Sequence, residues 1–213
     1  MRKLICFDMD NTIVYSDKAH VVAYNEALEK LGYRKKSEFF LRKLFGMPHL
    51  TLSKVILPKA DKKTIQKFLK VKHNIFMNKS YKLLKPIPNV GKTLNKLRKN
   101  YDLALLSNCS KSTILKTLRR VKLNKNLFKL VIGSGDVKNS KPKPDEILKA
   151  QKLYKHKPLF MVGDSVYDIL AGKKAGVKTI AVLTGNHSKS RLKRYGPNFI
   201  LKSVNEIPKL IKD

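Results

Sequence analysis

The segment Leu4-Ile5-Cys6-Phe7-Asp8-Met9-Asp10-Asn11-Thr12 decides how the rest of the chain is interpreted. Four apolar residues come first, and two aspartates follow two positions apart. An apolar run without a polar face predicts a buried strand that is covered by helices on both sides. Ligands of open α/β sheets bind beyond the carboxyl ends of the strands, which is where Asp8 and Asp10 are expected. The segment therefore predicts a strand that leads two carboxylates into a site.

Further apolar runs of this kind recur along the chain, with helical patterns between them. The runs cover residues 103–106, 130–132, 159–162 and 179–182, and the helical patterns cover 89–99, 111–121, 144–154 and 166–175. Within 144–154 we expect Ile147, Leu148 and Leu153 to share the apolar face. Because strands and helices alternate, the sequence predicts an α/β fold with a doubly wound parallel sheet.

One stretch breaks the alternation. Residues 17–81 carry helical patterns throughout, with a stop near Gly32 and further helices near 48–57 and 61–79. Prolines at positions 86 and 88 then mark the return to the sheet. We therefore expect a core domain formed by residues 1–15 and 83–213, with an inserted helical domain at 16–82.

The chain has the size and composition of a globular protein. Its 213 residues are 42% hydrophobic, which suffices for a sizeable core. No apolar run reaches the ~18–20 residues of a membrane-spanning helix, and the first residues turn acidic too soon for a signal peptide. We expect a cytoplasmic location and no membrane partner. The two cysteines, Cys6 and Cys109, lack the spacing of a metal site and are expected to be buried thiols.

The charge is strongly positive. Lysine and arginine number 47 against 15 aspartates and glutamates, which gives a net charge of +32. Such a balance attracts nucleic acid, anionic lipid or phosphorylated substrates. The lysines are spread along the whole chain without a nucleic-acid-binding motif, so we expect no specific nucleic acid partner and only nonspecific binding of polyanions at low salt. The sequence leaves the oligomeric state open.

Asp8 and Asp10 suit phosphoryl transfer. One carboxylate can attack phosphorus and form an aspartyl-phosphate, and the other can exchange protons with the leaving oxygen and with water. Two like charges beside a phosphate need a hard cation, and Mg²⁺ prefers oxygen ligands of this kind. Taken alone, the same pair is compatible with an ordinary turn.

Polar residues also follow three of the other predicted strands. Ser107 and Asn108 can donate hydrogen bonds to a phosphoryl oxygen. Lys141 lies among prolines that stiffen the backbone, so its ammonium can be directed at the phosphoryl group. Asp164 and Asp168 are four residues apart and can face the same way on the first turn of a helix. Each has an ordinary alternative, namely a turn, a solvated lysine or a helix cap, but their common position at strand ends favours a single phosphate site.

With these residues in place, the sequence resembles the haloacid dehalogenase superfamily. The resemblance lies in Asp8-Met9-Asp10-Asn11-Thr12, Ser107-Asn108, Lys141-Pro142-Lys143-Pro144 and Gly163-Asp164 through Asp168. The helical stretch after the first motif is similar to the cap of the phosphoglycolate phosphatase and β-phosphoglucomutase branch. The resemblance implies a Rossmann-like core with an inserted helical cap domain.

The resemblance also implies a role for each motif residue. Asp8 would be the nucleophile, Asp10 the general acid and base, and Ser107 and Lys141 would hold the phosphoryl group. The implied Mg²⁺ site comprises Asp8, the backbone carbonyl of Asp10, Asp164 and Asp168, the last acting directly or through water or Lys141. The implied substrate-binding residues are Thr12, Asn108, Arg42 and His20.

Some positions depart from the family pattern or have alternative interpretations. Asn11 stands where many relatives have glycine, and asparagine tolerates unusual backbone angles. Tyr15 stands where many relatives have aspartate, so the resemblance says little about substrate detail. Arg42 resembles a cap residue that binds a carboxylate or second phosphate, or it is a solvated helix charge. His20 resembles a histidine of the phosphomutases, or it is structural.

The sequence thus predicts a Mg²⁺-dependent phosphatase for a small phosphorylated metabolite, either phosphoglycolate-like or a sugar phosphate. Asp10 favours phosphoryl transfer because family members that dehalogenate lack a carboxylate at this position. A β-phosphoglucomutase-like phosphomutase and a pyrophosphatase are alternatives with the same chemistry, and phosphonate cleavage would need a suitably placed cap lysine. A nucleic-acid-binding protein on the same fold is the distant alternative.

Overall fold

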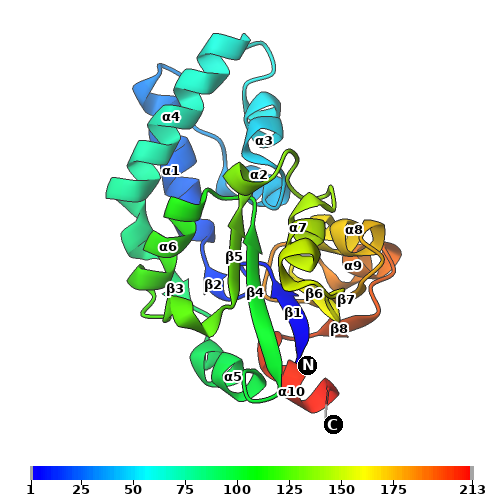
Figure 1. The fold of residues 1–213 in the computed structure, drawn as a ribbon. Helices are drawn as coiled ribbons and strands as arrows, with labels where there is room; N and C mark the ends of the chain where they lie inside the picture. Colours follow the sequence, from blue (N-terminus) through cyan, green and yellow to red (C-terminus); the bar gives the residue numbers. More distant parts are fainter. Residues whose placement is uncertain (1, 212–213) are drawn as a thin grey trace.

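The computed structural model describes residues 2–211 and places six parallel strands at the centre of the molecule (Figure 1). Their order across the sheet is β5-β4-β1-β6-β7-β8. The strands are β1 (Lys3–Phe7), β4 (Tyr101–Ser107), β5 (Leu130–Gly133), β6 (Phe160–Gly163), β7 (Lys178–Val182) and β8 (Phe199–Leu201). The predicted α/β fold class is confirmed, and β8 is an edge strand that the sequence did not predict. Because the chain leaves β1 toward β4 on one side and later returns to β6 on the other, the sheet has its switch point beside β1.

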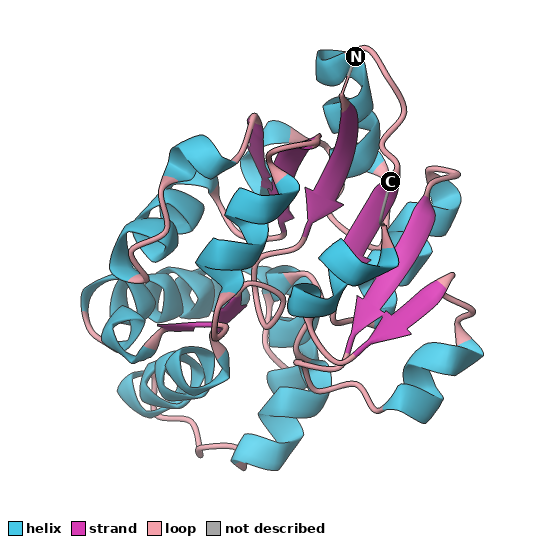
Figure 2. Ribbon diagram, turned by 90° about the horizontal axis from the view of Figure 1, so that it is seen from below, coloured by secondary structure: helices cyan, strands magenta, loops and turns pink. Residues whose placement is uncertain are grey.

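Helices cover both faces of the sheet (Figure 2). The side chains of β1 alternate, so that Leu4 and Cys6 pack against α7 and α8, while Ile5 and Phe7 pack in the cluster that includes α5. This two-sided burial explains why the strand is apolar throughout. The flanking helices are α5 (Val90–Leu97), α6 (Lys111–Arg120), α7 (Asp145–Tyr154), α8 (Val166–Lys174), α9 (Lys189–Arg194) and α10 (Ile207–Leu210).

Helix α7 differs from its predicted packing. Ile147 is fully buried, but Leu148 and Leu153 are 45% and 55% exposed. Adjacent helical positions point about 100° apart, so Leu148 cannot share the face of Ile147. That face is completed by the buried Ala150 instead.

A helical insertion, defined here as residues 17–83, lies between the two strands of a small antiparallel ribbon. The ribbon strands are β2 (Val14–Tyr15) and β3 (Lys85–Pro86), and the helices are α1 (Asp17–Lys30), α2 (Glu38–Leu44), α3 (His49–Ile56), α4 (Lys62–Asn78) and a 3₁₀ turn at Ser80–Leu83. The ribbon marks both points at which the chain enters and leaves the insertion. The division into domains at 15/16 and 82/83 stays a prediction.

The insertion stands beside the carboxyl ends of the strands, with α2 and α3 beyond the tips of β4 and β5 (Figure 1). Tyr24 of α1 and Phe68 of α4 are fully buried and belong to the same apolar cluster as Ile5 and Phe7 of β1. This continuous core holds the insertion against the sheet edge at which Asp8 emerges. Among the described residues, no helix has the length and apolar character needed to cross a membrane.

Candidate active site

Asp8 follows β1 directly and is anchored by both backbone and side chain. Its backbone N–H donates to the carbonyl of Val162 at 2.8 Å. Its carboxylate Oδ1 accepts a hydrogen bond from Lys141 Nζ at 2.5 Å. Burial raises the pKa of Asp8 well above its ordinary value. The positive charge of Lys141 lowers this pKa, and the negative charges of neighbouring aspartates raise it, so the net pKa remains raised.

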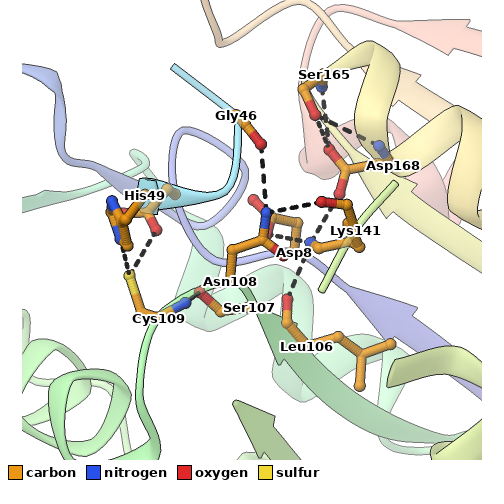
Figure 3. Close-up of polar contacts among 11 residues, drawn as sticks. Asp8, Gly46, His49, Leu106, Ser107, Asn108, Cys109, Lys141, Ser165 and Asp168 are labelled. Carbon is orange, nitrogen blue, oxygen red and sulfur yellow. Dashed lines mark hydrogen bonds and ion pairs between the residues drawn. The ribbon is translucent and has the colours of Figure 1, made fainter. Parts of the chain in front are cut away.

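Lys141 has all three of its ammonium donors engaged (Figure 3). They bind Asp8, the carbonyl of Leu106 at 3.2 Å and Asp168 Oδ1 at 2.8 Å. Burial alone would lower the pKa of Lys141, but the charges of Asp168 and Asp8 hold it well above its ordinary value. Lys141 is therefore a permanent, fully oriented positive charge beside Asp8.

Asp168 is fixed in turn by the first turn of α8. Its Oδ2 accepts hydrogen bonds from the backbone N–H of Ser165 at 3.1 Å and from its hydroxyl at 2.5 Å, and Ser165 Oγ caps the helix by accepting from the N–H of Asp168. Both carboxylate oxygens of Asp168 are thus committed to protein donors. This arrangement suits a residue that orients Lys141 and the site more than one that offers a vacant metal ligand.

Three buried carboxylates converge at the site. One oxygen from each of Asp8, Asp164 and Asp168 lies within 4.8 Å of the other two. Burial raises the pKa of Asp164 well above its ordinary value, and the charges of Asp8 and Asp168 raise it further. No side chain within residues 2–211 donates a hydrogen bond to Asp164, and a Cβ at Gly185 would collide with its carboxylate. These three carboxylates provide hard oxygen ligands and an excess of negative charge, which is the combination that Mg²⁺ prefers.

Asp10 lies two residues beyond Asp8 and faces the same pocket. Its Oδ1 lies 3.4 Å from His20 Nε2, and the opposite ring nitrogen of His20 lies 3.2 Å from Lys72 Nζ. Burial and the nearby ammonium of Lys72 lower the pKa of His20, so the ring is neutral, accepts from Lys72 and donates to Asp10. Burial is the largest single influence on the pKa of Asp10 and raises it, but the interactions with His20, Ser16 and His49 together outweigh burial, so the net pKa is lowered.

Loops of the sheet and of the helical insertion contact each other around Asn108 and Cys109 (Figure 3). The Asn108 amide donates to the carbonyls of Gly46 at 3.3 Å and Lys141 at 3.2 Å. Cys109 Sγ lies 3.7 Å from Asp10 Oδ2 and 3.6 Å from His49 Nε2. Burial, together with Lys72 and His20, lowers the pKa of His49 well below its ordinary value. Asp10 therefore sits where the insertion closes on the sheet.

Three of the residues expected at the site lie away from the pocket of Asp8. Ser107 is buried and its hydroxyl accepts from the N–H of Cys109 at 3.1 Å, while the Thr12 hydroxyl is buried without a hydrogen-bond partner among residues 2–211. Arg42 binds Asp17 at 3.0 Å and Glu38 at 2.6 Å and lines a neighbouring hollow. None of the three is among the residues that line the pocket at Asp8. Their roles in substrate binding stay predictions.

Asn11 adopts the backbone conformation that its position calls for. Its φ is +51°, in the left-handed region that asparagine tolerates. The side chain donates to Asp17 Oδ1 at 2.7 Å, and Asn186 donates to the same oxygen at 3.1 Å. With Arg42 on its second oxygen, Asp17 links α2 of the insertion to two loops of the sheet.

The cavity at Asp8 is small and adjoins a larger one, with which it shares part of its wall. The first measures about 60 Å³ and contains Asp8, Asp10, Lys141 and Asp164 on its walls. The second measures about 320 Å³ and shares His20, His49, Asn108 and Cys109 with the first. No sequence pattern marks His49, Cys109 or Lys72 as site residues, because each approaches Asp10 or His20 only through the packing of the insertion on the sheet.

A nucleophile-like aspartate, a buried lysine and an acidic cluster at one strand edge agree with the comparison to known families. A family model described as haloacid dehalogenase-like hydrolase matches residues 5–182. The chain belongs to the haloacid dehalogenase-like hydrolase family. It is therefore an enzyme of a hydrolase family, and the four motifs that suggested the resemblance all lie within the matched residues.

Individual relatives in this family cover nearly the whole chain. A phosphoglycolate phosphatase of Aquifex aeolicus is 30% identical over 98% of this chain and 96% of its own length. The pyrophosphatase PpaX of Oceanobacillus iheyensis is 28% identical over 99% and 97%. A haloacid dehalogenase-like hydrolase of Streptococcus pneumoniae superposes with a TM-score of 0.88 at 20% identity, covering 99% of both chains. The last similarity concerns the fold, and the first two place the chain among phosphatase-type members of the family.

The acidic cluster predicts a pH-dependent response of stability to metal. We expect saturating Mg²⁺ to raise the melting temperature by roughly 5–10 °C at pH 8, as binding at about 100 times Kd contributes ~2.7 kcal/mol. The rise should shrink at pH 5, because the raised pKa values of Asp8 and Asp164 let protons compete with the metal. Calorimetry with Mg²⁺, with chelator and with KCl of equal ionic strength measures the effect. Asp164→Asn should lose most of it, and an equal shift in KCl would contradict a specific site.

Proposed function

We propose that this chain is a Mg²⁺-dependent phosphatase that hydrolyses a small phosphorylated metabolite through an aspartyl-phosphate on Asp8. The observation that carries the proposal is the ion pair between Asp8 and Lys141, which fixes a carboxylate at the end of β1 with Asp10 facing the same cavity. A carboxylate in this position has an oxygen available for attack and a fixed positive charge nearby to stabilise the phosphoryl group.

In the first step, a carboxylate oxygen of Asp8 forms a bond to phosphorus while the bond from phosphorus to the leaving oxygen breaks. The negative charge of the bound phosphoryl group raises the pKa of Asp10 from its lowered value in the free protein, and protonated Asp10 gives its proton to that oxygen. In the second step, the resulting carboxylate of Asp10 takes a proton from water, the water oxygen bonds to phosphorus and the bond to Asp8 breaks. Inorganic phosphate and the original Asp8 carboxylate result, so atoms and charges balance.

Lys141 and Asp168 act by positioning and by charge. Lys141 neutralises negative charge on Asp8 and on the transferred phosphoryl group, and Asp168 holds Lys141 in place through the 2.8 Å hydrogen bond. Mg²⁺, when bound by Asp8, Asp164 and the backbone carbonyl of Asp10, supplies further positive charge for the phosphoryl oxygens. His20 orients Asp10 through its Nε2–H.

The helical insertion, in this proposal, acts as a cap that excludes water during the first step. Its contacts with the loops of the sheet at Asn108, Cys109 and Asn11 cover the site. An enclosed cavity admits small metabolites and excludes duplex nucleic acid or folded phosphoproteins. We further propose a cytoplasmic enzyme without a specific nucleic acid or membrane partner.

The test is phosphate release from a panel of phosphoglycolate, sugar phosphates, nucleotides and pyrophosphate, with Mg²⁺ and with chelator. We expect Mg²⁺-dependent release from at least one member of the panel, and loss of release with chelator. Conversion of β-glucose 1-phosphate to glucose 6-phosphate, dependent on a bisphosphate sugar and without net phosphate release, would indicate the mutase alternative. The absence of both activities would contradict the proposal.

A further inference from the structure

The larger of the two cavities, which we call the distal cavity, has no acidic residue on its wall. By contrast, the cavity at Asp8 has five aspartates. The distal cavity, of about 320 Å³, is lined by His20, His49, Leu69, Lys72, His73, Phe76, Asn108, Cys109, Ser110, Thr113 and Ser134. The two adjoining cavities therefore differ in the charge of their walls, one suited to a cation and a phosphoryl group and the other to an anion.

Lys72 provides the positive charge of the distal cavity in a buried position. Its side chain is only 5% exposed, and no carboxylate among residues 2–211 forms an ion pair with it. Its ammonium donates to the neutral ring of His20 and lies 4.7 Å and 5.1 Å from the ring centres of Tyr24 and Phe76. Burial of a charge without an opposite charge is costly, so the ammonium is a site for an anion that the protein itself does not supply.

The N-terminus of α6 faces the same cavity. Ser110 is its N-cap, with Oγ accepting from the backbone N–H of Thr113, and both residues line the distal cavity. The first turn of this ten-residue helix carries the positive end of the helix dipole. Together with Lys72, it makes the electrostatic potential of the cavity more positive.

We propose that the distal cavity receives a second anionic group, a carboxylate or a phosphate, carried by the leaving group of the substrate. This inference rests on the proposed phosphatase function and narrows its substrate class. Lys72 is separated from Asp10 by the single ring of His20, so the second anion lies within a few bonds of the phosphorus–oxygen bond that breaks. The substrate is thus a short molecule with two anionic groups.

The electrostatics of Lys72 agree with this role. Burial lowers its pKa to about 8, so most of the side chains remain charged at neutral pH. An anion beside the ammonium relieves the cost of burial and secures the protonated form. A neutral leaving group leaves the ammonium uncompensated, and such a substrate is expected to bind more weakly.

Matched substrates test the inference without requiring the natural one. Phosphoglycolate is compared with 2-hydroxyethyl phosphate, in which a neutral CH₂OH replaces the carboxylate, and pyrophosphate is compared with acetyl phosphate, an anhydride in which a neutral acetyl group replaces the second phosphoryl group. We expect kcat/KM to be roughly 10- to 100-fold higher for the anionic member of at least one pair, as expected for one hydrogen-bonded charge pair. The pair that shows the preference identifies the second anion as carboxylate or phosphate.

Lys72→Met removes the charge and keeps an apolar stem against Phe76. We expect it to lower kcat/KM for the preferred anionic substrate by roughly 10- to 100-fold, mainly through KM, with a much smaller effect on its neutral partner. Lys70→Met, which removes an exposed charge from the same helix, is the control and should match the wild type. Because Lys72 also contacts His20, its loss can slow the hydrolysis of both substrates. The decisive readout is therefore the change in the ratio of kcat/KM between the anionic substrate and its neutral partner.

The outcomes separate this inference from the proposed function. If the wild type hydrolyses both members of each pair equally, or if Lys72→Met slows both equally, the inference is wrong while the phosphatase proposal stands. If no phosphate ester or anhydride is hydrolysed, the proposed function itself fails. The Asp8→Asn variant cannot form the aspartyl-phosphate, so the equilibrium binding of each substrate to it can be measured without turnover. The anionic member of the pair should bind more tightly than its neutral partner.

Discussion

We expect Asp8→Asn to lower Mg²⁺-dependent phosphate release by at least about 10⁴-fold, because the amide cannot form the acyl phosphate on which both steps depend. The change keeps the shape of the side chain at the end of β1. Phosphate release with the best substrate of the panel measures the loss. Intact-protein mass after rapid quenching supplies a second readout, since a single phosphoryl group should appear on the wild type and not on the variant.

Stability distinguishes a chemical loss from unfolding. Burial raises the pKa of Asp8 above its unfolded value, so in metal-free protein ionisation of Asp8 costs stability. That cost is absent below the unfolded pKa and grows as the pH rises through the folded pKa. Asp8→Asn should therefore lose less stability than the wild type as the pH rises from 4 to 8. Asp102→Asn, at the opposite end of β4, is the control and should retain activity. Substantial turnover by folded Asp8→Asn would exclude Asp8 as the nucleophile.

The strands near the centre of the sheet were predictable because each consists of consecutive apolar residues. Residues 4–7 and 103–106 are apolar at every position, and only a strand with helices on both faces needs such a run. The edge strand Phe199–Leu201 has three partly buried residues, and the ribbon strands have two residues each. Segments this short carry no period that could separate them from loops.

Site residues at strand ends were predictable because topology brings the carboxyl ends of parallel strands together. Asp8, Lys141 and Asp164 come from distant parts of the chain and meet at one edge of the sheet. The motif order was sufficient to place them there. The acidic cluster and the ion pair with Lys141 then follow from the fold.

The contribution of the insertion was not predictable in the same way. Lys72 is one of 47 basic residues and has no local signature, and its burial depends on how α4 packs against α1 and the sheet. Cys109 was correctly expected to be a buried thiol, but its approach to His49 joins residues 60 positions apart. Arg42, whose substrate-binding role stays a prediction, forms an ion pair with Asp17 that the sequence did not predict. Which cations stay free for a ligand is decided by tertiary pairing.

Lys141→Met should destabilise the metal-free protein by about 3–5 kcal/mol at pH 8, because it leaves buried carboxylates without their shared cation. Asp8 and Asp168 lose a partner at 2.5 Å and 2.8 Å. The charge of Lys141 also lowers the pKa of the buried Glu146, which burial raises to about 7, and the carboxylate of Glu146 has no hydrogen-bond partner among the described residues. Denaturant unfolding measures the free energy, and Lys143→Met, exposed in the same loop, should stay near the wild type.

The pH dependence of Lys141→Met follows from the sign of each pKa shift. The pKa of Lys141 is raised above its ordinary value, so its stabilisation is complete below about pH 10 and changes little between pH 4 and 8 in the wild type. In the variant, the pKa values of Asp8 and Glu146 rise further, because Lys141 no longer lowers them, so ionising these two groups costs more as the pH increases. The deficit should therefore be small near pH 4 and largest near pH 8, and Mg²⁺ should recover part of it by neutralising Asp8. An equal deficit at both pH values would show that Lys141 acts through packing rather than through its charge.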